Sequence, residues 1–458
     1  MKDLRSLFIE HSARKAFDTG HRGRIAFNIS KYDDAVKIGK EQFSDLELAR
    51  KRAAYIRIRT LNNLEKHLID FVSAFEKNGG QVIWAQDAEE AVNEILRVFE
   101  KADAKMAVKS KSMATEEIDL NRHLEDAGIE VIETDLGEYI VQIAGEKPYH
   151  IVTPAMHKSK EDIAELFREK FGLSAEATPE EITSFVRKKL RKKFMQADIG
   201  ITGANFLIAE TGSVCITENE GNAFLSSSVP RIHIAIAGIE KIVPSLSDLQ
   251  LFWPLLATYG TGQNVTVYNS IVSGPRKAKE PDGPERMYLV LLDNGRTNLM
   301  AREKQKVALT CIKCGACLNA CPVYTNIGGH AYNTTYSGPI GSVITPFLND
   351  FYSYNHLSFA SSLCGRCTEV CPVKIPLHEM LLHNRNEAVR NNHLKRSEKW
   401  SMSFMKKILM KRKRMDFLGA GQKNMLLRAL LKKTWGAGRE LPEIAPRSFR
   451  ELWIERES

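Results

Sequence analysis

The organisation of this chain follows from one stretch, Cys311-Ile-Lys-Cys314-Gly-Ala-Cys317-Leu-Asn-Ala-Cys321-Pro322, and from a second one, Cys364-Gly-Arg-Cys367-Thr-Glu-Val-Cys371-Pro372. These two runs hold seven of the eight cysteines in the chain. The first run follows the C-x2-C-x2-C-x3-C-P spacing that ligates iron–sulfur clusters. The cysteines therefore predict an iron–sulfur protein.

The spacing also predicts which thiolates share a cluster. Three cysteines two residues apart converge on one cluster when the backbone coils around it, and the fourth, followed by proline, leaves the coil towards a second cluster. In two-cluster proteins the last cysteine of each run therefore serves the cluster held mainly by the other run. We predict two [4Fe–4S] clusters, the first held by Cys311, Cys314, Cys317 and Cys371 and the second by Cys321, Cys364 and Cys367.

The second run is one thiolate short. Counting back from Cys371, the position that would open this run is Ser361. The second cluster is therefore expected to have three thiolates and a fourth ligand from Ser361, water or another side chain, or else to be a [3Fe–4S] cluster. An oxygen ligand or an open site changes the potential and the lability of a cluster.

Two other uses of paired cysteines fit less well. Structural zinc needs four ligands, usually as two pairs with a wide gap, and seven cysteines in a 4+3 pattern with Cys-Pro endings do not match this. A disulfide framework would require a secreted protein, and nothing marks this chain as secreted.

Length and composition are those of a globular protein with two or three domains. The chain has 458 residues, 43% of them hydrophobic and 26% charged, and a net charge of +9. Its first residues lack the apolar region of a signal peptide, and no apolar run approaches the ~20 residues of a membrane span. Clustered thiols without a signal peptide predict a reducing compartment, so we expect a cytoplasmic protein.

Residues 1–300 alternate between helical and extended patterns. After a polar, basic N-terminal arm, such alternation predicts an α/β domain with a largely parallel central sheet. The expected helices are 43–77, 88–100, 159–171 and 178–196, with a further one starting at Thr115. The expected strands are 81–85, 105–108, 129–133, 197–202, 204–210, 214–217, 232–237, 265–268 and 287–292.

Ligands of such sheets bind at the carboxyl ends of the strands. Two loops of this domain are therefore candidate sites. One, Lys109-Ser110-Lys111-Ser112, follows a strand and opens a helix, where backbone N–H groups favour an anion. The other joins Glu210-Thr211-Gly212-Ser213 to residues 217–222. A capped helix and tight turns without any ligand explain both loops equally well. The lone Cys215 lies in a strand and is expected in the core.

The rest of the chain is expected to be helical. Helices over 297–310, 347–362 and 377–391, separated by a segment rich in glycine and proline, predict an all-helical two-cluster module over residues 301–394. Residues 395–458 form a basic tail, with thirteen lysines and arginines between 395 and 433 and apolar residues such as Trp400 and Phe404 at helical spacing. Such a tail can dock on a membrane surface, here the inner face, or on an acidic partner. It can equally pack on its own protein. Nucleic acid is not expected, because aromatic platforms are absent.

Both halves together resemble the lactate-utilisation protein B family. The matching stretches are Ala107–Met113, Glu133–Tyr139, Ile199–Asn205, Ala209–Ser213, Thr217–Asn222 and the cysteine-rich region, including Ile327-Gly-Gly-His330 and Gly338-Pro-Ile-Gly341. The resemblance implies an α/β fold similar to the sugar-phosphate isomerase and CoA-transferase group, joined to a ferredoxin-type module. It also implies a complex with two other lactate-utilisation subunits that oxidises L-lactate to pyruvate.

Three hypotheses follow for the function. In the first, the chain is the electron-carrying subunit of the oxidoreductase complex, because two one-electron clusters suit a two-electron oxidation; Lys109, Ser110 and Lys111 are then candidates for contacting a substrate carboxylate. In the second, the α/β domain is itself catalytic, with Glu210 as base or acyl acceptor, on fold analogy alone. In the third, the chain is a non-catalytic assembly or redox-sensing module.

Overall fold

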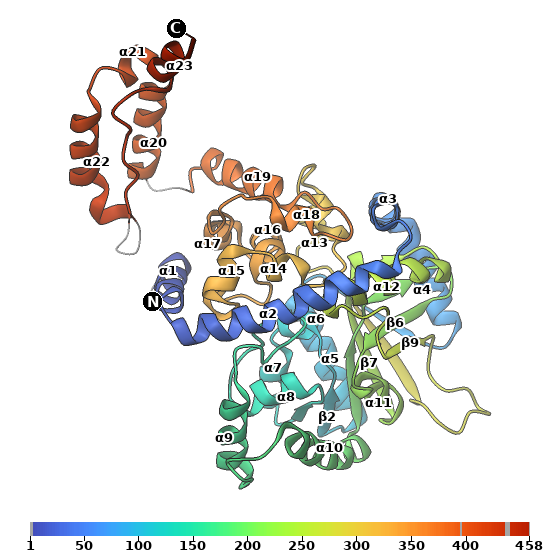
Figure 1. The fold of residues 1–458 in the computed structure, drawn as a ribbon. Helices are drawn as coiled ribbons and strands as arrows, with labels where there is room; N and C mark the ends of the chain where they lie inside the picture. The colour runs from blue at the N-terminus through green and yellow to red at the C-terminus, as the bar shows by residue number, and fades with distance from the viewer. Residues whose placement is uncertain (1–2, 394–395, 436–439, 458) are drawn as a thin grey trace. The chain divides into compact units, whose positions relative to one another are not determined.

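The computed structural model describes residues 3–393, 396–435 and 440–457, and the chain divides into two compact units, residues 1–387 and 388–458 (Figure 1). The first unit contains the α/β part and the cysteine-rich part. The second unit contains the basic tail, residues 395–458.

A six-stranded, fully parallel sheet forms the centre of the α/β part. Its strand order is β1 (Gln81–Ala85), β10 (Arg286–Leu292), β7 (Ile232–Gly238), β4 (Ile199–Gly203), β2 (Met106–Lys109) and β3 (Glu130–Glu133). The central strand β7 is buried at every position, as expected for a strand with both sheet faces covered. This parallel sheet confirms the predicted α/β class.

Helices and a second sheet cover the two faces. The apolar stripe of α5 (Ala88–Ala102) and that of α7 (Leu120–Asp126) share one core with β4, β7 and β10. Helices α8 (Leu136–Ile143), α9 (Lys160–Phe171) and α10 (Pro179–Gln196) pack near β2. Thr178 and Ser159 begin α10 and α9 with reciprocal capping boxes, which satisfy the first N–H groups of each helix.

A separate four-stranded sheet was not predicted. It has the order β8 (Ile242–Val243), β5 (Phe206–Ile208), β6 (Ser213–Glu218) and β9 (Tyr268–Val272). The turn that contains Gly212, with φ of 61°, folds β6 back antiparallel to β5 and so removes both strands from the parallel sheet. The expectation that these strands extend one largely parallel sheet was therefore wrong for this segment.

The N-terminal arm expected over residues 1–43 is mostly helical, as is the segment that follows it. Together they form α1 (Leu4–Ala16), α2 (Thr19–Gly39), α3 (Leu46–Asn62) and α4 (Leu64–Lys77). The single helix expected over 43–77 is broken at Asn63, whose φ of −122° and ψ of 32° interrupt the helix. In Figure 1, α2 runs along the unit, and it packs on α15 (Pro322–Ile327) of the cysteine-rich part and on α12 (Leu249–Thr261) of the α/β part.

The cysteine-rich part is helical, and its described residues 301–393 contain no strand. Its main helices are α16 (Gly338–Leu348) and α19 (Leu377–Arg390). Helix α16 occupies the segment that was expected to break the chain, and the helix predicted over 347–362 is only the short α17 (Phe351–Tyr354) and a 3-10 turn. Every residue of α16 is buried, so packing overrides its glycines and prolines.

The second unit consists of helices α20 (Arg396–Leu409), α21 (Arg412–Met415), α22 (Ala420–Trp435) and α23 (Phe449–Glu457). Within α20, α21 and α23 no side chain is buried, and Trp400 and Phe404 stack on each other with ring centroids 5.7 Å apart. Among the described residues, no helix is both long enough and apolar enough to cross a membrane.

Candidate iron–sulfur centre and adjoining cavity

The first cysteine run coils around its own sulfur atoms. Lys313 and Gly315 have positive φ angles of 60° and 82°, and they reverse the chain before the short helix α14 (Ala316–Asn319). The reversal directs the N–H of Lys313 at Cys311, whose Sγ accepts a hydrogen bond of 3.3 Å.

The backbone φ angles of the second run closely match those of the first. Leu363 and Gly365 have φ angles of 56° and 83°, and α18 (Arg366–Glu369) follows in the place of α14. Ser361 Oγ accepts a hydrogen bond of 3.1 Å from the N–H of Leu363, just as Cys311 Sγ accepts one from Lys313. Ser361 thus takes the local position of an opening cysteine.

Four cysteines from both runs line one apolar cavity: Cys311, Cys314, Cys317 and Cys371. Burial and the nearby thiol of Cys311 raise the pKa of Cys314, and burial raises the pKa of Cys371 to about 12. Thiols crowded in such a place become thiolates when a metal centre neutralises them. Backbone N–H groups face the sulfurs, including that of Ile375, 3.3 Å from Cys371 Sγ. This donor set fits a [4Fe–4S] cluster.

The other three cysteines form a second group. Burial, followed by the thiols of Cys321 and Cys364, raises the pKa of Cys367 to about 11. Burial and Cys364 likewise raise the pKa of Cys321. Cys321 and Cys367 are buried, whereas Cys364 is exposed. Cys321, Cys364 and Cys367 thus lie close enough to influence one another, and with Cys364 exposed this second group is nearer to solvent than the first.

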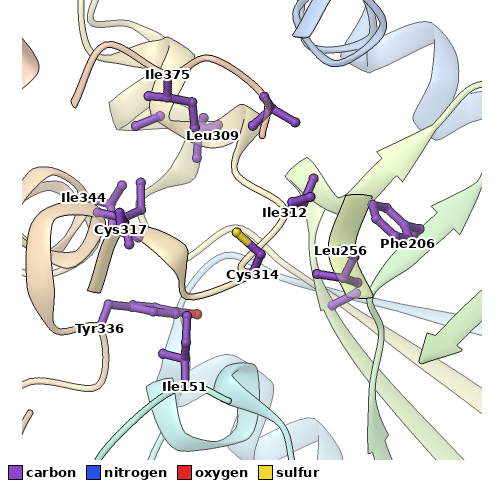
Figure 2. Close-up of a cluster of buried hydrophobic side chains, with 14 of the residues drawn as sticks. Ile151, Phe206, Leu256, Leu309, Ile312, Cys314, Cys317, Tyr336, Ile344 and Ile375 are labelled. Atoms are coloured by element: carbon purple, nitrogen blue, oxygen red, sulfur yellow. The ribbon is translucent and has the colours of Figure 1, made fainter. Parts of the chain in front are cut away.

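The α/β part forms one wall of the first cysteine cavity. The loop between α8 and α9, residues 144–159 and here called the cap loop, places Ile151 in that cavity. Figure 2 shows Cys314 between Leu256 of the α/β part and Ile344 of the cysteine-rich part, with Ile151 nearby. One continuous apolar core therefore joins the two parts.

Arg57 of α3 fixes the chain just before the first run. Its buried guanidinium donates to the carbonyls of Glu240 and Ile242, at 2.6 and 2.7 Å, and to those of Leu309 and Thr310, each at 3.1 Å. The side chain of Arg57 therefore links Thr310, the residue before Cys311, to the turn that follows β7 and to β8.

A larger cavity of about 360 Å³ adjoins Cys314, and we call it the strand-end cavity. It lies where β2, β4 and β7 end, so Ser110, Gly203 and Gly238 line it, together with Ile151 of the cap loop. This is the edge at which parallel sheets bind ligands. The same cysteine therefore lines both the predicted cluster site and a strand-end cavity.

Side chains of both charges line the strand-end cavity. Asp135, Glu218 and Glu220 line the cavity, and burial followed by the charge of Asp135 raises the pKa of Glu220 to about 7. Lys241 and Lys313 line the cavity together with Cys314. The ammonium of Lys313 lies 4.0 Å from the ring centroid of Tyr336.

A buried ion-pair network lies beside the strand-end cavity. Arg296 makes two hydrogen bonds to the Glu117 carboxylate, at 2.8 and 2.9 Å, and one to Glu240 at 2.5 Å. Tyr336 donates to Glu117 at 2.7 Å. These contacts join the α/β part to the cysteine-rich part, with Arg296 shared between the carboxylates of Glu117 and Glu240.

Comparison with known proteins agrees with this two-part arrangement. The sequence matches the LUD domain family over residues 68–292 and the 4Fe-4S dicluster domain family over residues 307–375. It is 45% identical to lactate utilization protein B of Bacillus pumilus, over 89% of this chain and 85% of that one. It is 49% identical to the protein of that name from Bacillus cytotoxicus, over 76% of this chain and 73% of that one. This chain belongs to the lactate utilization protein B family.

A solved structure is also similar, a DUF162 family protein from Deinococcus radiodurans at 14% identity. It covers 52% of this chain and 98% of its own, with a TM-score of 0.27, a superposition too loose for the two sites to be compared.

In this member of the lactate utilization protein B family, two candidates from the sequence lie away from the strand-end cavity. Lys109 is fully buried at the end of β2, 2.8 Å from Glu133 and 3.2 Å from Glu116. Although burial opposes it, these carboxylates raise the pKa of Lys109. Glu210 is exposed and accepts a hydrogen bond from the N–H of Leu246 at 3.1 Å. Ser110 and Lys111 do line the cavity, and Lys111 donates to the carbonyl of Val152 at 2.8 Å.

Sequence reasoning missed Lys241 and Lys313. Lys241 ends the 3-10 turn Ile239–Lys241 directly after β7, so a lysine following a buried strand was the available signal. Cys215 is in the core as expected and accepts a hydrogen bond from Trp253 Nε1 at 3.2 Å. His157 lies 2.6 Å from Glu146 and beside His330, and burial lowers the pKa of His157 to about 4, so Lys158 is the cation that pairs with Glu146.

Proposed function

We propose that this chain is the electron-transfer subunit of a complex that oxidises L-lactate to pyruvate. The observation that carries the proposal is the position of Cys314, which lines both the first cysteine cavity and the strand-end cavity. The names of the relatives supply the substrate. Two other lactate-utilisation subunits are the proposed partners.

We further propose Cys311, Cys314, Cys317 and Cys371 as ligands of one [4Fe–4S] cluster and Cys321, Cys364, Cys367 and Ser361 as ligands of the other. When bound, each cluster supplies one-electron transfer, and oxidation of a 2-hydroxy acid releases two electrons.

The residues of the chain set the conditions for this transfer. Ile151 and Ile375 exclude water from the first group of cysteines, and backbone N–H groups stabilise negative charge on the sulfurs. The exposed Cys364 places the second group at the surface, within reach of a partner. Electrons would therefore enter at the buried group and leave at the exposed one.

Electron paramagnetic resonance on anaerobically prepared protein tests the proposal. We expect two distinct cluster signals per chain after chemical reduction, and reduction by L-lactate only when the partner proteins are present. Zinc in place of iron and acid-labile sulfide would refute the assignment of the clusters. Two clusters that lactate never reduces, even in the complete complex, would refute the proposed role in lactate oxidation.

A further inference from the structure

We propose that the strand-end cavity binds a small monocarboxylate, with Lys241 as the residue that holds its carboxylate beside Cys314. The inference rests on the proposed function, because it assigns the 2-hydroxy acid or its 2-oxo product a place on this chain. It differs from the expectation drawn from the sequence, which pointed to Lys109 and Lys111.

The first step of the argument is that Lys241 lacks a partner of its own. Within residues 3–393 its ammonium has no hydrogen bond and no ion pair, although it lines the cavity. The adjacent carboxylate of Glu240 accepts a hydrogen bond from Arg296 at 2.5 Å; its charge acts on Lys241 without a direct contact. A half-buried ammonium without a hydrogen-bonded partner is costly and therefore favours an anion that can contact it.

The backbone explains why Glu240 and Lys241 diverge. Gly238 ends β7, and a Cβ atom there would lie 2.1 Å from Glu240 Oε2 and 2.3 Å from Arg296 Nε. Only glycine allows the carboxylate to fold back to Arg296, and the next residue, Lys241, lines the cavity. Burial lowers the pKa of Lys241, and the charge of Glu240 opposes this shift.

The second step concerns the size and charge of the ligand. A cavity of about 360 Å³ lies within the range of small-molecule sites. Asp135, Glu218 and Glu220 line the same cavity, so a polyanion such as a nucleotide or a sugar bisphosphate would meet like charges. A single carboxylate at Lys241 avoids them, and a hydroxyl group elsewhere on the ligand can donate to an acidic side chain or to Asn205.

The other lysines of the cavity are less available. Lys111 donates to the carbonyl of Val152 and lies 3.8 Å from Asp135, and Lys313 rests on the ring of Tyr336. Lys241 is therefore the residue whose removal should affect binding most.

Calorimetry on the anaerobic protein with its clusters, without partners, tests the inference with L-lactate and pyruvate as probes. We expect saturable binding of at least one of them, weakened at least about tenfold by Lys241→Met and largely retained by Lys241→Arg, because a charged hydrogen bond is lost in the first variant only. Lys101→Met, at an exposed position of α5, is the matched control and should bind like the wild type.

A second variant leaves every charge in place. Ala204 lines the cavity, so Ala204→Leu should fill part of it and weaken binding even if Lys241→Met loses iron. No saturable binding by the wild type, unchanged binding by both Lys241→Met and Ala204→Leu, or equally tight binding of inorganic phosphate would overturn the inference. Binding of lactate without reduction of the clusters in the complete complex would instead overturn only the proposed function.

Discussion

Ser361 takes, in the second cysteine run, the backbone position that Cys311 takes in the first. The backbone around Ser361 repeats that around Cys311, and both side chains accept a hydrogen bond from the residue two positions later. The difference between the two sites is therefore one of ligand chemistry and not of local fold.

Replacing Ser361 by cysteine should complete the second run. We expect the signal of the second cluster to shift and its loss in air to slow, because a fourth thiolate closes the site. The first cluster should be unaffected. Paramagnetic resonance and the decay of visible absorbance in air measure both effects. Ser362→Cys, at the exposed neighbouring position, is the control, and an identical response of the two variants would remove Ser361 as a ligand.

The cysteines and the cavity residue Lys241 differ in how far the sequence predicts their roles. The grouping of the cysteines follows from local spacing, which sets the local coil of each run. Lys241 belongs to the cavity only because β7 ends beside β4 and because Arg296, far along the chain, binds Glu240. Such a placement depends on tertiary structure, so no characteristic spacing of residues in the sequence reveals it.

Among the elements, the two coiled runs offer a matched pair of glycines. Gly315 and Gly365 both have φ near 80°, but a Cβ atom on Gly315 would lie 3.1 Å from Val152 and 3.3 Å from His150, whereas one on Gly365 would meet nothing within 4 Å. The difference arises because only the first run is covered by the cap loop.

Alanine at these two positions should therefore have unequal effects. Both variants pay about 1–2 kcal/mol for the left-handed backbone, and only Gly315→Ala also displaces the cap loop. We expect Gly315→Ala to lower the thermal midpoint further and to disturb the first cluster, while Gly365→Ala disturbs the second mildly. Equal midpoints for the two variants would contradict the role of the cap loop.

Helix α3 is tied to the first run by Arg57. We expect Arg57→Lys to cost about 3 kcal/mol or more, because lysine cannot reach all four carbonyls and leaves some of them buried and unpaired. Arg52→Lys, at an exposed position of the same helix, should be nearly neutral. Thermal scans at one fixed rate, followed by loss of cluster absorbance, compare the two variants.

The order of helices and strands was predictable where patterns are local, as in α5, β2 and β7. The four-stranded sheet was not, because β8 and β9 join it only through distant partners. Helix α16 was missed although its residues are local. Its glycines and prolines argue against a helix, but its complete burial stabilises one.

At the scale of the molecule, the buried network of Arg296, Glu117 and Glu240 should make stability depend on acid. Although burial opposes it, Arg296 lowers the pKa of Glu240 to about 2. A lowered pKa stabilises the folded state above the ordinary value of 4.5, and this contribution is lost as the pH falls from there towards 2.

Glu240→Gln should therefore be less stable than the wild type at pH 7, by about 1–3 kcal/mol, and the difference should shrink as the pH falls below 4.5. Denaturant midpoints measured across this range test the prediction. Glu303→Gln, at an exposed position, should show no such convergence, and a constant difference for Glu240→Gln would contradict the assigned pKa.

The cap loop also has a consequence for how the protein is made in the cell. Residues 144–159 leave the ribosome long before the cysteines do, yet in the finished fold Ile151 lines the cavity of the first group of sulfurs. We therefore expect iron and sulfide to enter more readily before the cap loop packs than after it. Synthesis that outpaces the supply of iron should then lower the yield of protein with its first cluster.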